Sequence, residues 1–195
     1  WFGSDLYNIE PDLMSLAKGL TSAYMPMSAV VISQKVWDVI LSGSRETGVF
    51  AHGFTYTGHP VAAAAALANM DILENDGLIQ NGEEVGGYMQ QRLHEAFDDH
   101  PLVGEVRGTG MIAAVDLKAD KATKKPFDPT LMVGRRVVAA AAEHGLISRA
   151  VPGGELTFAP PLCITRPEVD EMVDLFGKAL NEVRDALVKD GSWKG

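Results

Sequence analysis

The sequence has 195 residues and a mass of 20.9 kDa, with 46% apolar and 22% charged residues, a balance that is typical of globular proteins and excludes wholesale disorder. Its 17 basic residues are outnumbered by 26 acidic ones, and the formal charge of −9 disfavours a nucleic-acid binder, which needs a basic face. The longest apolar run, residues 61–68, is too short to cross a bilayer, and the single cysteine, Cys163, excludes an internal disulfide framework and a cysteine-only zinc cage.

The first third of the sequence predicts one strand and two helices. Residues 28–33 have the length and β-branched content of a buried strand, and Ser33 can cap a helix that follows. Residues 44–60 are rich in Gly, Thr and His and predict a loop. Pro60 suits the first turn of the next helix, residues 61–73, in which alanine dominates. We expect this helix to be buried, because its small side chains permit close approach of other backbones.

Helices and short strands alternate after about residue 75. The final helix has the clearest signals, since Thr165 and Glu168 form a capping box ahead of an apolar stripe at helical spacing. The whole sequence therefore predicts an α/β first part followed by an α+β part. The elements expected in this second part are a helix at 83–97, strands at 103–106 and 111–117, a helix at 129–144 ended by Gly145, a strand, bend and strand within 146–164, and the final helix.

Several common catalytic motifs are absent or unsupported. There is no G-x-S-x-G elbow, and His52 and His59 have no metal-ligand spacing, so we expect no metal site. Residues 108–113 fit the letters G-x-G-x-x-A of a dinucleotide fingerprint, but a strand rather than a helix is predicted to follow. Cys163 lies between two apolar residues and is expected in the core rather than as a nucleophile.

Three segments have residues that suit the binding of a reactive or anionic group. Lys18, between apolar residues and a glycine, is expected to be poorly solvated, which favours the nucleophilic neutral amine; the alternative is a surface lysine. Residues 52–60 combine hydroxyls, glycines and a following helix, as anion sites do, or else form an ordered connection with its aromatic rings packed beneath it. Arg149 precedes a glycine pair and suits a carboxylate clamp or a surface salt bridge.

The order of these segments and their residues resemble the motifs of the class III aminotransferases, which are fold type I pyridoxal-phosphate enzymes. The resemblance is strongest to the omega-transaminase branch of that family. Residues 11–32 (PDLMSLAKGLTSAYMPMSAVVI) resemble the cofactor-lysine segment of that family, and residues 52–67 (HGFTYTGHPVAAAAAL) its phosphate-binding loop and following helix. Residues 106–117 (VRGTGMIAAVDL) resemble the opening of its C-terminal domain, and residues 145–165 (GLISRAVPGGELTFAPPLCIT) complete the match.

The resemblance implies a role for four residues. Lys18 matches the lysine that holds pyridoxal 5'-phosphate as a Schiff base and shuttles a proton between substrate and cofactor. Thr55 matches the threonine that binds the cofactor phosphate in the neighbouring subunit's site, so a homodimer is implied, and Phe54 would contribute its backbone NH. Arg149 matches the mobile arginine that pairs with a substrate carboxylate.

The resemblance also implies how the chain is organised. Residues 1–75 would be the C-terminal part of the cofactor-binding large domain, with its mostly parallel sheet flanked by helices, and residues 76–195 the small C-terminal domain. The chain opens at Trp1 without an initiator methionine, which predicts a piece of a longer enzyme. The family's Gly-Ser phosphate turn, its stacking aromatic ring and the Asp that keeps the pyridine nitrogen protonated would all precede it.

The function implied is transamination, in which an amino group passes from an amine or omega-amino acid to a keto acid such as pyruvate, in a cytoplasmic homodimer with small-molecule substrates. Two alternatives stay open. One is another class III pyridoxal-phosphate enzyme, a decarboxylase or an aminomutase. The other is a catalytically silent fragment that acts only as a folding or interaction module.

Overall fold

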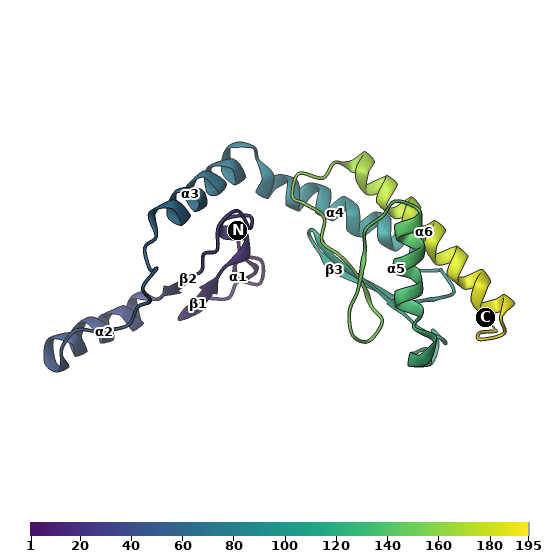
Figure 1. Ribbon diagram of the computed structural model, residues 1–195, viewed down its shortest axis with the longest axis horizontal. Coiled ribbons are helices and arrows are strands. Elements are labelled where there is room, and N and C mark those ends of the chain that lie inside the picture. Colours follow the sequence, from purple (N-terminus) through teal and green to yellow (C-terminus); the bar gives the residue numbers. More distant parts are fainter. Residues whose placement is uncertain (195) are drawn as a thin grey trace. The chain divides into compact units, whose positions relative to one another are not determined.

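The computed structural model describes residues 1–194 of the chain. It consists of two compact units, unit 1 (Trp1–Leu78) and unit 2 (Ile79–Gly195), each with helices and strands of its own (Figure 1). The mixed helix-and-sheet class expected from the sequence is confirmed.

Unit 1 contains one two-stranded sheet. Strand β1 (Leu13–Leu16) pairs with β2 (Ala29–Ile32) in antiparallel register from Leu13↔Ile32 to Leu16↔Ala29. The strand predicted at 28–33 is therefore confirmed, but the pairing differs from the mostly parallel sheet implied by the resemblance. The connection between these two strands, residues 17–28, contains only the short helix η1 (Lys18–Leu20) and no α-helix of the kind that usually links parallel strands. The short helix α1 (Gly3–Leu6) precedes the sheet.

The two long helices of unit 1 begin where the sequence predicts, whereas the short helix α1 was not expected. Helix α2 (Gln34–Thr47) starts after Ser33, whose side chain accepts a hydrogen bond from the backbone N of Val36 at 3.4 Å. It runs past the loop start expected at residue 44 and ends at Gly48, whose φ of 98° no longer continues the helix. Helix α3 (Pro60–Asn75) starts at Pro60, with His59 as its N-cap.

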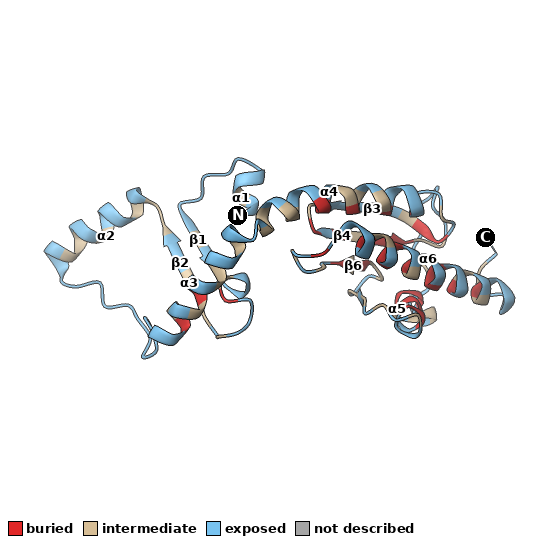
Figure 2. Ribbon diagram, turned by 90° about the horizontal axis from the view of Figure 1, so that it is seen from above, coloured by how far each residue is buried: buried red, intermediate tan, exposed pale blue. Residues whose placement is uncertain are grey.

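The expected burial of the alanine-rich helix α3 is wrong for this chain. Only Ala62 and Ala66 are buried, while Val61, Leu67 and Ile72 are exposed. The helix has apolar residues on nearly every side, so one neighbouring segment cannot cover it. Figure 2 shows the same lack of burial in α2, which has no buried residue.

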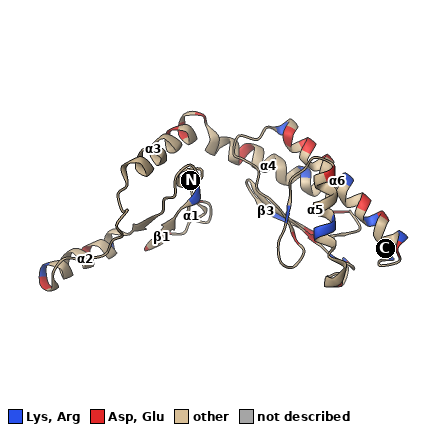
Figure 3. Ribbon diagram, viewed as in Figure 1, with Lys and Arg blue, Asp and Glu red and all other residues tan. Residues whose placement is uncertain are grey.

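Unit 2 is an antiparallel sheet covered by long helices. Its strands lie in the order β3-β4-β6-β5. Buried residues gather on the helices and on the sheet (Figure 2), and the exposed side of α6 carries acidic and basic residues along its length (Figure 3). The elements are α4 (Leu78–Phe97), β3 (Val103–Thr109), β4 (Ile112–Leu117), η2 (Pro129–Leu131), α5 (Val133–Glu143), β5 (Arg149–Ala150), β6 (Leu156–Phe158) and α6 (Arg166–Lys189).

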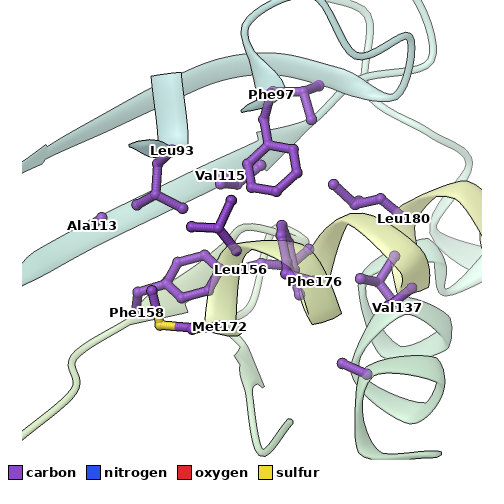
Figure 4. Close-up of a cluster of buried hydrophobic side chains, with 14 of the residues drawn as sticks. Leu93, Phe97, Ala113, Val115, Val137, Leu156, Phe158, Met172, Phe176 and Leu180 are labelled. Carbon is purple, nitrogen blue, oxygen red and sulfur yellow. The ribbon is translucent and has the colours of Figure 1, made fainter. Parts of the chain in front are cut away.

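The core of unit 2 is built around Phe176 of α6, which is fully buried. Its ring meets Phe97 of α4 edge-on, with 5.2 Å between the ring centroids, and Phe158 of β6 at 4.9 Å. Figure 4 shows Leu93, Val115 and Leu180 in the same cluster. Every apolar position of the predicted α6 stripe is buried, and the capping box of Thr165 and Glu168 is confirmed.

Two glycines allow α4 to approach the β3–β4 hairpin closely. A Cβ atom at Gly86 of α4 would lie 2.6 Å from the backbone carbon of Gly110, and one at Gly108 would lie 2.6 Å from Oε1 of Gln90 on α4. The G-x-G-x-x-A letters therefore belong to a hairpin, in which Thr109 pairs with Ile112. As the sequence predicts, a strand follows them rather than a helix.

The remaining expectations for unit 2 hold in part. The strand, bend and strand within 146–164 are confirmed as β5 and β6, and Gly145, with φ 94°, ends α5. The helix predicted from Pro129 instead begins at Val133, because Met132 has a left-handed φ of 46° that separates it from η2. The core position expected for Cys163 is wrong, since the side chain is exposed while the adjacent Ile164 turns into the core.

Candidate cofactor site

Lys18 lies in a strained turn between β1 and β2. It opens the short helix η1 (Lys18–Leu20) with a left-handed φ of 52°, and Ser22 and Ala23 are left-handed too, at 46° and 65°. Each such conformation costs a residue other than glycine about 1–3 kcal/mol, and it persists only where surrounding contacts fix it. Such strain is common at functional sites. The poor solvation expected of Lys18 is not observed, because the residue is exposed.

Two polar side chains fix this turn. Thr21 is 2% exposed, and its hydroxyl donates a hydrogen bond to the carbonyl of Met25 at 2.6 Å. Asn69, which lies on α3, donates through Nδ2 to the carbonyls of Gly19 at 2.8 Å and Leu20 at 3.2 Å. Its Oδ1 accepts a hydrogen bond from the hydroxyl of Ser22 at 2.7 Å. The backbone around Lys18 is thus held both from within and from a helix about fifty residues further along the chain.

Phe54 and Thr55 lie in the exposed segment between α2 and α3. The backbone NH of Phe54 donates to the hydroxyl of Thr57 at 3.0 Å, so this NH is already engaged. The Thr55 hydroxyl has no hydrogen bond to any residue that the structure describes. Aromatic packing beneath this segment is not observed, because Phe54 is 78% and Tyr56 81% exposed. Residues 53–59 end directly at the N-terminus of α3.

Arg149 lies on β5 in unit 2, whereas Lys18, Phe54 and Thr55 all belong to unit 1. Its Cα is paired with that of Thr157 on β6, and the Thr157 hydroxyl donates to the Arg149 carbonyl at 3.4 Å. Arg149 is exposed and forms no ion pair within residues 1–194, so the surface salt bridge considered for it is not observed. Its guanidinium is available to an external carboxylate.

A cavity of about 620 Å³ opens in unit 2 but contains none of the four predicted residues. It lies between the N-terminal end of α5 and the turn that joins β5 to β6. The cavity is lined mainly by apolar residues, which include Phe127, Pro129, Met132, Val133, Val151 and Pro152.

No group of His, Cys, Asp and Glu within residues 1–194 is placed to hold a metal ion, and none of the described helices is both long and apolar enough for a membrane span.

The comparisons with known proteins identify the family. The model of the class III aminotransferases matches residues 1–180, and the chain belongs to that family. It is 52% identical over 192 residues to the diaminobutyrate–2-oxoglutarate transaminase of Halomonas elongata, covering 98% of this chain and 41% of that protein. It is 41% identical to the vanillin aminotransferase of Capsicum frutescens, covering 93% of this chain and 39% of that one.

Solved transaminase structures have the same fold. A transaminase from directed evolution by ancestral reconstruction superposes with a TM-score of 0.93 at 57% identity, covering 95% of this chain and 41% of that one. The omega transaminase of Pseudomonas jessenii in complex with PMP gives 0.88 at 41% identity, covering 95% and 40%. The chain thus spans about 41% of the length of the first curated relative it matches.

The residues of unit 1 fit pyridoxal phosphate, the cofactor of this family. An exposed lysine amine on a fixed turn suits the cofactor's aldehyde. The free hydroxyl of Thr55, just ahead of the 16-residue helix α3, suits a phosphate, because a helix N-terminus attracts anions. The contacts of Asn69 were missed by the sequence analysis. Their one signal is that Asn69 is the first polar residue of α3, directly after the apolar run of residues 61–68.

Proposed function

We propose that this chain supplies the cofactor lysine and the substrate-carboxylate arginine of a pyridoxal-phosphate-dependent transaminase. The enzyme would move an amino group from an amine or omega-amino acid to a keto acid such as pyruvate. The observation that carries the proposal is the strained, doubly anchored turn of Lys18 within the segment that matches the family model. Unit 1 would belong to the cofactor-binding domain, and unit 2 would form the small C-terminal domain.

Each candidate residue has a defined task in this proposal. The Lys18 amine would hold the cofactor and would move a proton at the substrate carbon. Thr55 and the N-terminal end of α3 bind the phosphate, with the Phe54 NH joining them if Thr57 releases it. Arg149 pairs with a substrate carboxylate through its planar fork and moves aside for a carboxylate-free amine. When bound, pyridoxal phosphate supplies the electron sink for the reaction.

The assembly and location belong to the same proposal. The enzyme would be a homodimer in which Thr55 reaches the neighbouring subunit's cofactor, and it would work in the cytoplasm. Both statements rest on the resemblance. The exposed position of Thr55, with a hydroxyl not bonded to the described part of its own chain, supports the first of them.

The test is a chimera in which this chain replaces the matching segment of the Halomonas elongata transaminase. The chimera is incubated with pyridoxal phosphate and reduced with borohydride, and the modified lysine is located by peptide mapping. We expect the label on Lys18 and amino transfer to pyruvate, with neither in Lys18→Ala. Lys35→Ala is the matched control, because Lys35 is exposed and its one ion pair within residues 1–194 is with Asp12, at 3.4 Å.

Two results would contradict the proposal. One is labelling or amino transfer that survives in Lys18→Ala. The other is a product of decarboxylation or of amino migration within one substrate, which would instead indicate another class III activity. Product analysis by mass spectrometry separates these reactions from amino transfer.

A further inference from the structure

The side-chain amide of Asn69 makes all its hydrogen bonds with the turn that carries Lys18. Its Nδ2 group donates to the carbonyls of Gly19 and Leu20, and its Oδ1 accepts from the hydroxyl of Ser22. These contacts define the orientation of the amide, because the reverse orientation would place Oδ1 against two carbonyl oxygens. The Asn69 amide thus binds two backbone carbonyls and one side-chain hydroxyl of the turn that follows Lys18.

Asn69 lies inside helix α3, where an asparagine lowers the stability of the helix, and its hydrogen bonds support the turn of Lys18. Asparagine is less favourable than alanine inside a helix, and the residues between Pro60 and Asn69 are all alanine, valine or leucine. A side chain that weakens its own helix must be compensated by the tertiary contacts it makes. All of those contacts go to a turn with three left-handed residues, Lys18, Ser22 and Ala23, which needs outside support.

Helix α3 joins the lysine turn to the phosphate loop. The segment with Phe54 and Thr55 ends at Pro60, and Asn69 follows nine residues later in the same uninterrupted helix. At 1.5 Å per residue, about 14 Å of rigid helix separates the two. A shift of α3 would therefore move the Lys18 turn and the phosphate loop together.

We propose that Asn69 is a positioning residue for Lys18, which it holds in register with the phosphate loop at the N-terminus of α3. Asn69 acts through the backbone of Gly19 and Leu20. The inference rests on the proposed function for the role of Lys18, but the hydrogen bonds that carry it do not. A catalytic amine that is displaced by about 1 Å can react roughly a hundredfold more slowly, so the contacts matter for chemistry as well as for stability.

The experiment uses the chimera and three substitutions. Asn69→Asp keeps the size of the side chain, removes both donors and sets a carboxylate against the two carbonyl oxygens. Asn75→Asp makes the same change of charge on the exposed C-terminal end of α3, away from the turn, and is the matched control. Ser22→Ala removes only one of the three hydrogen bonds. The readouts are the rate of borohydride-trapped attachment of pyridoxal phosphate to Lys18 and the melting temperature before the cofactor is added.

We expect Asn69→Asp to slow attachment at Lys18 by roughly tenfold to hundredfold. Its melting temperature should fall below that of Asn75→Asp, because the new carboxylate faces two carbonyl oxygens, and the slower attachment should persist well below that melting temperature. Asn75→Asp should attach cofactor at the unmodified rate. Ser22→Ala should slow attachment by a smaller factor. Attachment at the unmodified rate in Asn69→Asp would overturn the inference. If Asn69→Asp fails to fold, Ser22→Ala decides: slower attachment supports the inference, and an unchanged rate overturns it.

A failure of the proposed function is recognised separately. If the unmodified chimera does not attach cofactor at Lys18, the lysine assignment fails, and amide hydrogen exchange of the 195-residue chain then tests the positioning contact alone. Faster exchange at residues 19–24 in Asn69→Asp, but not in Asn75→Asp, supports a turn held by Asn69. Equal exchange in both variants overturns it.

Discussion

Arg149 and Arg107 lie in one row across the sheet of unit 2 but differ in their partners. Arg149 pairs with Thr157, Thr157 with Ala114, and Ala114 with Arg107, so all four side chains belong to the same face. Arg107 is held by Glu105 at 3.6 Å and Glu155 at 3.7 Å. Arg149 has no such carboxylate partner in the described part of the chain.

This difference predicts the effect of removing each charge. In the chimera, Arg149→Gln should raise the KM for pyruvate roughly tenfold to hundredfold, since a charge-assisted hydrogen bond contributes about 1.5–3 kcal/mol. The kcat/KM for a carboxylate-free aldehyde acceptor should change little. Arg107→Gln serves as the control and should leave both values near those of the unmodified chimera. Equal losses with both acceptors would contradict a carboxylate clamp.

His100 predicts how stability depends on pH. Its Nδ1 accepts a hydrogen bond from the backbone N of Leu102 at 3.2 Å, and its Nε2 is buried. Burial, with the positive charges of Arg184 and Lys121 nearby, lowers the pKa of His100 below its ordinary value of 6.5. The unfolded chain therefore takes up this proton first as the pH falls. Stability from this group is complete above pH 6.5 and is lost as the pH falls towards the lowered pKa.

Urea unfolding between about pH 5 and pH 8 measures this effect on the free energy of unfolding. We expect the free energy to fall on the acid side in the unmodified chain. His100→Asn can still accept the Leu102 NH but does not titrate, so its curve should be flatter over the same range. A variant curve as steep as the original would assign the pH dependence to other groups.

At the scale of the element, α3 and α6 show two ways in which a helix can be apolar. Helix α6 has apolar residues on one stripe and charges on the other side, and the sheet of unit 2 buries that stripe. Helix α3 is apolar on nearly every side, and only Ala62 and Ala66 are covered. The sequence of an amphipathic helix predicts which of its faces is buried. For a helix that is apolar on nearly every side, the buried face depends on the segments that surround it.

The capping box of α6 predicts a local contribution to stability. The Thr165 hydroxyl accepts from the Glu168 backbone, and Glu168 accepts from the Thr165 backbone at 2.8 Å, which lowers the pKa of the Glu168 carboxyl. Thr165→Ala should reduce the free energy of unfolding by about 1 kcal/mol, whereas Thr165→Ser keeps the hydroxyl and should stay within a few tenths of the original. Urea denaturation measures the free energy of unfolding of both variants. An equal loss in the two variants would indicate that Thr165 stabilises the protein by packing rather than by capping α6.

At the scale of the whole molecule, stability is divided unevenly between the two units. The hydrophobic core cluster lies entirely in unit 2, and unit 1 contributes only Ala62 and Ala66 to the buried apolar residues. Of the exposed large apolar side chains, all but Ile112, Met132, Ile147 and Val188 belong to unit 1. Buried apolar area is the main source of stability, so unit 1 of this chain should open far more readily than unit 2.

Limited proteolysis tests this division. Chymotrypsin should cut first within residues 48–59, where the aromatic side chains are exposed and no helix or strand protects the backbone, and a fragment close to unit 2 should persist. Phe176→Ala, which should cost about 3–5 kcal/mol of stability, should remove that resistance. Equal resistance of both units in the unmodified chain would contradict the division.

The sequence by itself determined the elements whose signals are local. The α6 helix follows from the capping box of Thr165 and from its stripe, and the start of α3 from Pro60, because caps, proline and periodicity act over only a few residues. The order of motifs around Lys18, Thr55 and Arg149 was enough to indicate the family. The core position expected of Cys163 and the burial of α3 were wrong, because burial depends on segments distant in sequence.

Only the tertiary structure decided what surrounds the candidate residues. No local sequence pattern shows that the Asn69 amide forms hydrogen bonds with the turn of Lys18, since the two are about fifty residues apart in the sequence. Nor does any pattern show that Arg149 faces outward without a carboxylate while Arg107, in the same row of the sheet, is held by two. Chain composition fixes which side chains are present, but long-range packing selects which of their polar atoms are already bonded and which are left for a ligand.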